Sequence, residues 1–161
     1  MVQLTRFLVL IYLGLGGSAS ALDEGTDLQS AGKLARQRGV PVMVVFSARH
    51  CEYCERLQNE HVDPMLLQAE YREHLVVLRV TVDRPGDIRD FAGVAVPPDE
   101  FANRYAVQIT PTVIFFDDQG RMLTKKLEGY TNPAFYGYYL DDAIAIARGK
   151  LNAKSPPAQR L

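Results

Sequence analysis

The chain lacks several features that would mark other classes of protein. It has no tryptophan and only two cysteines among its 161 residues, which leaves no framework of several structural disulfides. It also has no excess of charge of one sign, because 18 basic and 19 acidic residues give a formal net charge of −1. Since the charges are interspersed and form no basic patch, we expect no nucleic-acid partner. No apolar stretch reaches the ~20 residues that a membrane-spanning helix needs.

The first residues have the pattern of an export signal. Residues 1–6 end in a positive charge, residues 7–15 are apolar, and Ala19-Ser-Ala21 supplies small residues at a cleavage point. We therefore predict a signal peptide over residues 1–21 and a periplasmic or secreted protein. An uncleaved membrane anchor is the alternative, which the short apolar stretch disfavours. Export would place the protein in a compartment where disulfides persist.

The two cysteines, Cys51 and Cys54, follow an apolar run over residues 41–46. A strand that leads into C-x-x-C at the start of a helix is typical of a dithiol/disulfide redox site. This spacing places both sulfurs on one side of the first helical turn. Unpaired N–H groups and the helix dipole favour an anion there, so we predict that Cys51 forms the nucleophilic thiolate. Cys54, one turn further in, then resolves the mixed disulfide.

The remaining pattern predicts an α/β domain over residues 22–149 and a disordered tail over residues 150–161. Hydrophobic periodicity and turn residues predict, in order, a helix over 27–38, a strand over 41–47, and a helix over 51–59 that kinks or restarts at Asp63-Pro64. A strand over 75–83, an irregular segment over 84–98, a short helix over 99–105, strands over 112–117 and 121–128, and a helix over 133–148 are predicted to follow. Helices between the early strands imply parallel pairing, and a tight turn over 118–120 implies an antiparallel hairpin. We therefore expect a mixed four-stranded sheet with helices on both faces.

This organisation resembles the thioredoxin superfamily. Three features carry the resemblance: Cys51-Glu-Tyr-Cys54 after the first buried strand, Ile109-Thr-Pro-Thr112 entering a later strand, and a hairpin over 115–120 followed by Gly129-Tyr130 and a last helix. Two further features, the tyrosine inside the C-x-x-C motif and the predicted export signal, are most similar to the periplasmic SoxW-type and isomerase-type branch. The resemblance implies a thioredoxin fold over most of the chain.

The resemblance also implies a role for Thr110 and Pro111. In the family, the proline at this place is cis and packs beside the dithiol, whereas an ordinary X-Pro bond is cis only about one time in twenty. A cis proline exposes the preceding backbone N–H and C=O, which can pair with an extended peptide. We therefore expect Thr110 and Pro111 to position the substrate.

The sequence departs from the family's pattern at two places near the cysteines. His50 replaces the tryptophan that commonly precedes the first cysteine, and Val45 stands where many thioredoxins carry a buried acid that deprotonates the second. Proton transfer must then use another group, with Glu52, Glu55 and water as candidates. His50 and Glu52 are also predicted to tune the nucleophilic thiolate. Arg49 is interpreted as a solvated loop residue.

Aromatic residues are concentrated on the last predicted helix. Phe135 and Tyr139, spaced i, i+4, are predicted to pack against the sheet. Some of their aromatic neighbours must then face solvent.

Two alternatives to a redox enzyme remain open. A zinc site built from the cysteines with His50, His61 or His74 is disfavoured, because structural zinc sites usually combine two close ligand pairs and the sequence has no second pair. We therefore expect no metal and no other cofactor. The stronger alternative is a thioredoxin-fold binding module whose cysteines only sense redox state. Val45 and the long segment over 84–98 are compatible with it.

From these patterns we predict an exported thiol–disulfide oxidoreductase that acts as a monomer on disulfide-containing proteins. Reduction is the expected direction. Proofreading isomerases of this compartment typically carry a dimerisation domain before the fold, and we expect no such domain here. Oxidation or isomerisation is the alternative. A reductase would draw its electrons from a membrane thiol donor, and this expectation also rests on analogy with the family.

Overall fold

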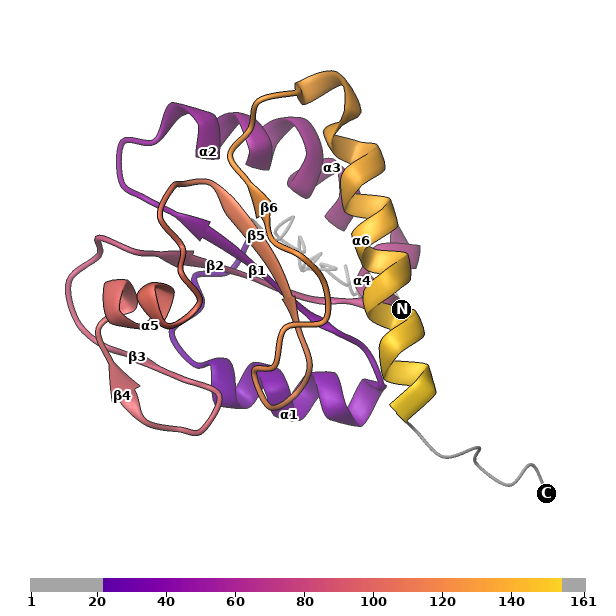
Figure 1. Ribbon diagram of the computed structural model, residues 1–161, viewed down its shortest axis with the longest axis horizontal. Coiled ribbons are helices and arrows are strands. Elements are labelled where there is room, and N and C mark those ends of the chain that lie inside the picture. Colours follow the sequence, from indigo (N-terminus) through magenta and orange to yellow (C-terminus); the bar gives the residue numbers. More distant parts are fainter. Residues whose placement is uncertain (1–21, 155–161) are drawn as a thin grey trace, which may run out of the picture.

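Strand β1 (Val42–Ser47) runs through the centre of the protein in the computed structural model, which describes residues 22–154 (Figure 1). All six of its residues are buried, as expected for an apolar run covered on both faces. It pairs in parallel with β2 (Val76–Thr81) and antiparallel with β5 (Thr112–Phe116). Strand β6 (Leu127–Glu128) pairs antiparallel with β5 and completes the sheet order β2-β1-β5-β6. The predicted mixed four-stranded sheet is confirmed.

Side chains that alternate along the strands enter two separate hydrophobic cores. The first, which we call the Tyr130 core, consists of Leu22, Met43, Val45, Leu57, Val62, Met65, Leu75, Val113, Phe115, Leu123, Tyr130, Tyr136, Leu140, Ala143, Ile144 and Ala147. The second, which we call the Phe101 core, consists of Leu28, Ala31, Ala35, Val40, Val42, Val44, Phe46, Val76, Val80, Ile88, Val96, Phe101, Ala102, Val107, Ile114 and Phe116. Successive residues of one strand therefore contribute to opposite faces of the sheet.

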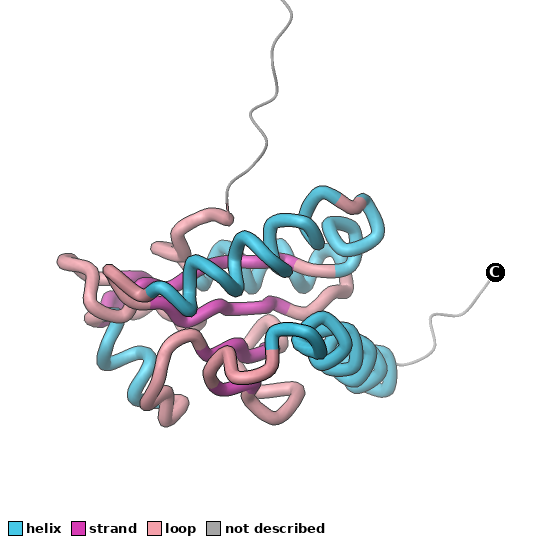
Figure 2. Tube along the Cα trace, turned by 90° about the horizontal axis from the view of Figure 1, so that it is seen from above, coloured by secondary structure: helices cyan, strands magenta, loops and turns pink. Residues whose placement is uncertain are grey.

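The helices divide between these two cores, so that helical segments lie on both sides of the strands (Figure 2). The Phe101 core is covered by α1 (Leu28–Arg38) and α5 (Pro98–Arg104). The Tyr130 core is covered by α6 (Pro133–Lys154) and by the chain of short helices α2 (Glu52–Leu57), η1 (Gln58–Val62), α3 (Asp63–Leu67) and α4 (Ala69–His74).

Helix α1 shows how local sequence sets an element's ends. The Asp27 side chain accepts the backbone N–H of Ser30 and caps the N-terminus. The helix ends at Gly39, whose φ of 65° lies in the left-handed region that glycine adopts at little cost. Both ends agree with the predicted helix.

The helical segment after the cysteines agrees with the prediction in part. A kink or restart was expected at Asp63-Pro64, and α3 does begin at Asp63, but the backbone stays helical there, because Asp63 has φ −63° and ψ −46°. The π-helical turn η1 precedes it and accommodates Pro64, which has no N–H to donate to the preceding turn. The helix breaks instead at Gln68, whose ψ is 128°.

Two predictions for the middle of the chain are wrong in part. The strand predicted over 121–128 is reduced to β6 and an isolated bridge between Phe116 and Met122. The ladder is interrupted near Thr124, whose hydroxyl donates to the carbonyl of Lys125 and so competes with strand pairing. The segment over 84–98 is not irregular throughout, because β3 (Ile88–Arg89) pairs antiparallel with β4 (Ala95–Val96).

The last helix also differs from its prediction. It continues through Gly149 to Lys154, since Leu151 still packs against the Tyr130 core, so residues 150–154 are helical and not a disordered tail. The aromatic prediction is wrong by one position. Phe135 and Tyr139 are 59% and 42% exposed, whereas the i, i+4 pair that enters the core is Tyr136 and Leu140. The buried stripe continues from that pair through Ala143, Ile144 and Ala147, which fixes the helix face.

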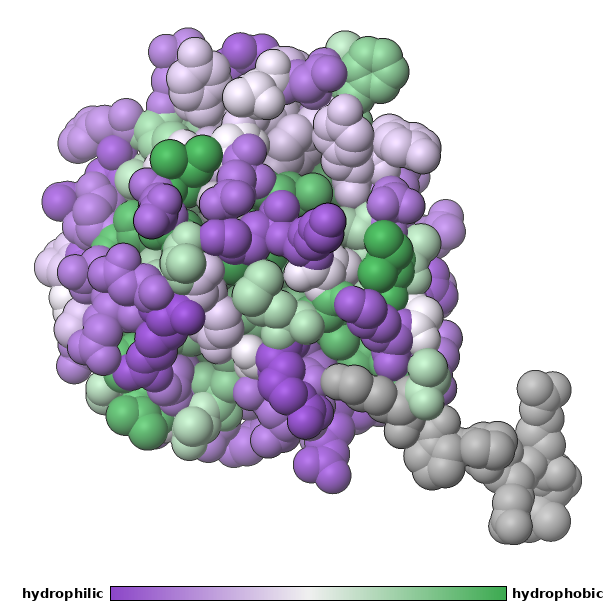
Figure 3. All heavy atoms as spheres, in the orientation of Figure 1, coloured by the Kyte–Doolittle hydropathy of each residue, from purple (hydrophilic) through white to green (hydrophobic). Residues whose placement is uncertain are grey.

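The first described residue, Leu22, is 4% exposed and belongs to the Tyr130 core. The predicted signal peptide over 1–21, and residues 155–161 of the predicted tail, lie outside the described residues. Between residues 22 and 154, no helix is both long enough and apolar enough to cross a membrane. On the face shown in Figure 3, apolar side chains are scattered in small groups among polar ones.

Candidate active site

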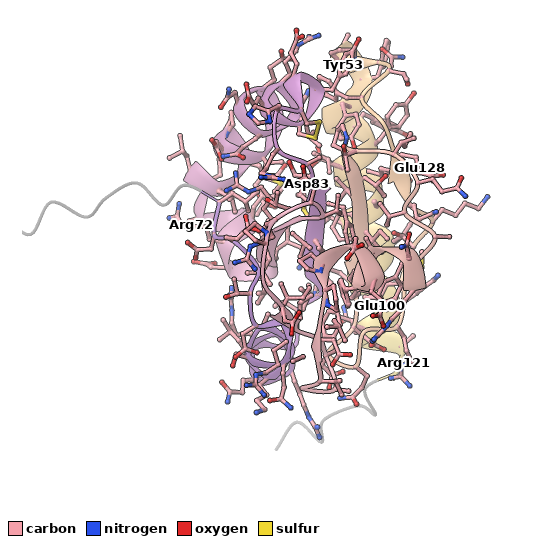
Figure 4. All side chains as sticks on the ribbon, turned by 90° about the vertical axis from the view of Figure 1, so that its left-hand side faces the viewer. Tyr53, Arg72, Asp83, Glu100, Arg121 and Glu128 are labelled. Atoms are coloured by element: carbon pink, nitrogen blue, oxygen red, sulfur yellow. A yellow bond between two sulfur atoms is a disulfide. The ribbon has the colours of Figure 1, made fainter. Side chains whose placement is uncertain are left out.

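A disulfide joins Cys51 and Cys54 where β1 leads into α2, at the end of the molecule marked by Tyr53 (Figure 4). The two Cα atoms are 5.2 Å apart. Cys51 is the N-cap residue of α2, and its sulfur accepts the backbone N–H of Cys54 at 3.3 Å. Cys51 is half-buried, whereas Cys54 is only 5% exposed. The Cys51 sulfur is therefore the one that a partner can reach, and a backbone N–H already points at it.

The loop before Cys51 is held by Asp83, which follows β2 (Figure 4). Its Oδ1 accepts the Arg49 backbone N–H at 2.8 Å, and its Oδ2 accepts the Arg49 Nε–H at 3.3 Å. The hydrogen bond from the Arg49 backbone lowers the pKa of Asp83, and the Arg49 charge adds to this effect. His50 follows with a φ of 56°, which a non-glycine residue adopts rarely.

These observations change the interpretation of one predicted residue. Arg49 is exposed, as expected for a solvated loop residue, but it is also tied to Asp83 through backbone and side chain. His50 and Glu52 are both exposed on either side of Cys51. Their predicted effect on the thiolate stays a prediction.

Thr110 and Pro111 lie directly beside the disulfide. The Thr110–Pro111 peptide bond is cis, as the family resemblance implies. The Thr110 Oγ1 is 3.6 Å from the Cys51 sulfur, and the hydroxyl must be the donor because a disulfide sulfur carries no hydrogen. Within residues 22–154, the backbone N–H and carbonyl of Thr110 have no hydrogen-bond partner. They are therefore free to pair with an added strand.

A groove of about 480 Å³ opens next to these residues. It is lined by Tyr53, Arg56, Ile109, Thr110, Gly129, Tyr130, Thr131 and Pro133. Tyr53 and Ile109 are 57% and 51% exposed, so they offer apolar surface at its rim. A second hollow, of about 250 Å³, shares Ile109 and Thr110 with the first. Thr110, with its unpaired backbone groups, thus borders both hollows.

The groove depends on residues that the sequence did not reveal. Tyr130 is only 4% exposed, and its hydroxyl donates to Glu60 Oε2 at 2.5 Å. Arg56 donates from Nε to Glu60 Oε1 at 2.9 Å and lies 5.5 Å from the centre of the Tyr130 ring. Burial and the bond to Glu60 raise the pKa of Tyr130 to about 12, so the phenol stays protonated. Only the Gly129-Tyr130 pair and the i, i+4 spacing of Arg56 and Glu60 could have indicated this cluster in advance.

The position of the usual buried acid is apolar here. Val45 is 2% exposed within the Tyr130 core. Glu52 and Glu55 are both exposed on α2. Proton transfer at Cys54 through one of them, or through water, stays a prediction.

The histidines do not gather at the cysteines. His61 packs against the rings of Tyr130 and Tyr136, with centroid distances of 5.7 and 5.6 Å, and His74 ends α4. In the described part of the chain, no group of three or more His, Cys, Asp or Glu side chains is arranged to hold a metal ion.

A dithiol/disulfide pair at the start of a helix, beside a cis proline and on a mixed four-stranded sheet, defines the thioredoxin-fold class of redox sites. Residues 28–144 match the family model of the thioredoxin-like domain, and the chain belongs to this family. The matched span lies inside the domain predicted over 22–149. No curated protein matches the sequence.

Solved structures give the same fold. Oxidised mitochondrial thioredoxin 3 from Saccharomyces cerevisiae is 19% identical, with a TM-score of 0.53 over 80% of this chain and 98% of its own. Thioredoxin from Fasciola hepatica is 21% identical, with a TM-score of 0.52 over 77% and 97%. Deadhead, a germline-specific thioredoxin from Drosophila melanogaster, is 19% identical, with a TM-score of 0.53 over 75% and 98%. At these identities the likeness concerns the fold alone, and the C-x-x-C disulfide on that fold supports thiol–disulfide oxidoreductase chemistry in general.

Proposed function

We propose that this chain is an exported reductase of protein disulfides, with Cys51 as nucleophile and Cys54 as resolving cysteine. The observation that carries the assignment of the two cysteines is the asymmetry of the pair, whereas export and the reductive direction rest on the sequence pattern and the family resemblance. Cys51 is half-buried, caps a helix and contacts Thr110, whereas Cys54 is buried one turn further in. An incoming disulfide therefore meets Cys51 first.

The two thiols carry the exchange, and Glu52, Glu55 and water are the candidates to accept the proton of Cys54 before it attacks. In the reduced protein, the Cys51 thiolate attacks one sulfur of the substrate disulfide, and the other substrate sulfur leaves as a thiolate. The Cys54 thiolate then attacks the Cys51 sulfur and releases the second substrate sulfur. Two electrons pass from the dithiol to the substrate, whose two thiolates take up protons, and the protein is left with its disulfide.

Two neighbouring groups favour this sequence of steps. The Thr110 hydroxyl can donate to the Cys51 sulfur, and the backbone N–H of Cys54 points at the same atom, so both stabilise negative charge on it. The free backbone groups of Thr110 can align an extended polypeptide beside Cys51. We propose disulfide-containing proteins as substrates and a membrane thiol donor as the source of electrons, with the protein acting as a monomer in the periplasm or outside the cell.

The reduction potential of the Cys51–Cys54 pair tests the proposed direction. Residues 22–161 are equilibrated with glutathione redox buffers, and free thiols are trapped and counted by mass spectrometry. A reductase is expected to have a potential of about −270 to −230 mV. A value of about −180 to −120 mV would instead assign the protein to the oxidants or isomerases.

A redox-sensing binding module is the second candidate function, and the burial of Val45 favours it. Without an acid beneath the dithiol, resolution through Cys54 lacks the usual proton acceptor. Repeated turnover of an oxidised polypeptide with dithiothreitol as donor separates the two functions. A reductase turns over many times per protein molecule, whereas a sensor reacts once and is regenerated slowly.

A further inference from the structure

The Gly129-Tyr130 wall of the groove is fastened to the helical segment that follows the cysteines. We propose that Glu60 and Tyr130 form a latch that holds this wall in place, and that the latched groove makes the protein select polypeptide disulfides over small ones. This inference rests on the proposed function, because it concerns the substrates of the same site.

The latch joins two segments that are 70 positions apart in sequence. Tyr130 reaches from the loop after β6 to Glu60 in η1, and the distance between its hydroxyl and Oε2 is 2.5 Å. Glu60 is exposed, so the bond costs little burial of its carboxylate, whereas the Tyr130 ring is buried in the core. A hydrogen bond to a charged acceptor is stronger than one between neutral groups.

The π-helical turn places Glu60 at this point. A π turn inserts an extra residue into the helical ladder and changes which side chains face a neighbouring element, and such turns are frequent at functional sites. In η1 the next residue, His61, packs against the rings of both Tyr130 and Tyr136. Gly137 of α6 lies opposite the His61 ring, where a Cβ would be in ordinary van der Waals contact, 3.5 Å from His61 Nδ1. The turn therefore presents two successive side chains to the wall and to α6.

The other end of the wall is tied to the cis proline. The Gly129 backbone N–H donates to the Pro111 carbonyl at 2.8 Å, and Gly129 has a φ of 73°. Thr110, which precedes Pro111, contacts the Cys51 sulfur. The wall is thus fixed on one side to the residues beside the nucleophile and on the other to Glu60.

The charges at the latch favour an apolar occupant. Arg56 lines the groove, but its guanidinium is paired with Glu60 and lies against the Tyr130 ring, so the groove presents little net charge. Tyr53, Ile109 and Pro133 supply the remaining apolar surface. A polypeptide can place an apolar side chain there while its cysteine reaches Cys51. A small disulfide contacts the sulfur alone and gains nothing from the wall.

Tyr130→Phe tests the latch, and Tyr136→Phe is its matched control. Both tyrosines are 4% exposed in the same core, but in the part of the chain that the structure describes the Tyr136 hydroxyl has no hydrogen-bond partner. Each variant removes one buried hydroxyl, and only the first breaks the bond to Glu60. Each pre-reduced protein is mixed with a peptide disulfide that carries leucine beside its cysteine, or with bis(2-hydroxyethyl) disulfide. The reaction is quenched at intervals, and the fraction of protein that has been oxidised is measured by mass spectrometry, which gives a rate constant for each disulfide.

We expect Tyr130→Phe to slow reaction with the peptide roughly three- to tenfold and to leave the small disulfide unchanged. Tyr136→Phe should alter neither rate constant. Glu60→Gln keeps the ring and an acceptor but removes the charge, so it should give a smaller loss on the peptide alone. Equal rates for Tyr130→Phe and wild type, or equal losses on both disulfides, would overturn the latch.

The proposed function has a separate control in the wild-type protein. If it turns over neither disulfide with dithiothreitol as donor, the proposed function fails and the latch fails with it. If it turns over the small disulfide but shows no preference for the leucine peptide, only the latch is overturned.

Discussion

The two faces of the sheet are built from different chemistry. The Phe101 core is closed by aromatic rings in contact: the Phe101 ring stacks on Phe46 at 5.9 Å between centroids, tilts against Phe91 at 6.3 Å and meets Tyr105 edge-on at 5.2 Å. The Tyr130 core holds two tyrosines and borders Glu60, His61 and the helix of the disulfide. The first face supplies packing, whereas the second combines packing with the polar groups that shape the site. Changes to the Phe101 core should therefore alter stability and leave the redox chemistry unchanged, whereas changes to the Tyr130 core should alter both.

The largest expected effect comes from breaking the Phe101 core. Phe101 is 1% exposed, and Phe101→Ala should lower the free energy of unfolding by about 3–5 kcal/mol. Denaturant unfolding of the oxidised protein measures this loss. Phe135→Ala, at a residue that is 59% exposed, is the matched control and should change stability by less than about 0.5 kcal/mol. Similar losses in the two variants would contradict the assignment of the core.

Neighbouring valines of β1 test the two faces directly. Val45→Asp places a carboxyl in the Tyr130 core, where many thioredoxins carry an acid, and should speed resolution through Cys54. Val44→Asp places the same group in the Phe101 core and should not. Each variant should lose on the order of 2–3 kcal/mol at neutral pH.

The pH dependence of these two variants has a defined sign. Burial disfavours the charged form and raises the pKa of the introduced carboxyl above its unfolded value of about 3.9. The part of the penalty that comes from ionisation is therefore absent below about pH 4 and grows as the pH rises towards the folded pKa, whereas the cost of burying the neutral carboxyl remains at every pH. Unfolding and single-turnover rates from pH 3 to 8 measure both effects. Faster turnover in both variants, or in neither, would show that the face of the sheet does not matter.

A smaller effect is expected at the loop before the nucleophile. Asp83→Asn removes the ion pair with Arg49, and we expect alkylation of reduced Cys51 to change by roughly two- to fivefold. Asp117→Asn is the control, because Asp117 accepts the backbone N–H and Nε–H of Arg121 in the same way, and Figure 4 places Arg121 at the end of the molecule away from the disulfide. It should lower stability and leave alkylation unchanged.

The pKa values of Asp83 and Asp117 predict the pH range in which their contacts with arginine are lost. The Arg49 backbone hydrogen bond lowers the pKa of Asp83. Burial alone would raise the pKa of Asp117, but the hydrogen bonds from Arg121 more than offset it, and that pKa is lowered too. A lowered folded pKa gives stability that is present above about pH 4 and lost as the pH falls through the folded value. Wild-type alkylation should therefore keep its dependence on Asp83 down to about pH 4 and lose it only at lower pH, and a difference between wild type and Asp83→Asn that disappears well above pH 4 would contradict this.

The smallest effect is expected from His50→Ala. His50 is exposed with a φ of 56°, and its charge, when present, favours the neighbouring thiolate. We expect the alkylation profile of Cys51 to shift to higher pH by a few tenths of a unit. His74→Ala, at the far end of α4, is the control. Identical profiles for the two variants would remove His50 from the site.

Local signals explain which parts of the molecule could be predicted. Three features each depend on only a few neighbouring residues, so they can be predicted from a single sequence: the buried run of β1, the cap at Asp27 and the C-x-x-C at a helix start. The Thr110-Pro111 motif was readable only through the family resemblance, because base rates favour a trans bond. These signals were enough to find the sheet and the disulfide.

The parts that were missed depend on contacts between distant segments. Tyr136 and not Tyr139 enters the core, because the position of α6 on the sheet selects one of two overlapping i, i+4 pairs. The hydrogen bond between Tyr130 and Glu60 depends on the π-helical turn, and no local residue preference predicts such a turn. The extension of α6 beyond Gly149 depends on the packing of Leu151.

The central claim is that Cys51 attacks and Cys54 resolves, and single-cysteine variants test it most directly. Reduced Cys54→Ser and Cys51→Ser proteins are each mixed with an oxidised polypeptide, and mixed disulfides are counted by mass spectrometry. Cys54→Ser should accumulate a mixed disulfide through Cys51, whereas Cys51→Ser should accumulate little, because Cys54 is only 5% exposed. Equal or greater accumulation by Cys51→Ser would contradict the assignment of the nucleophile.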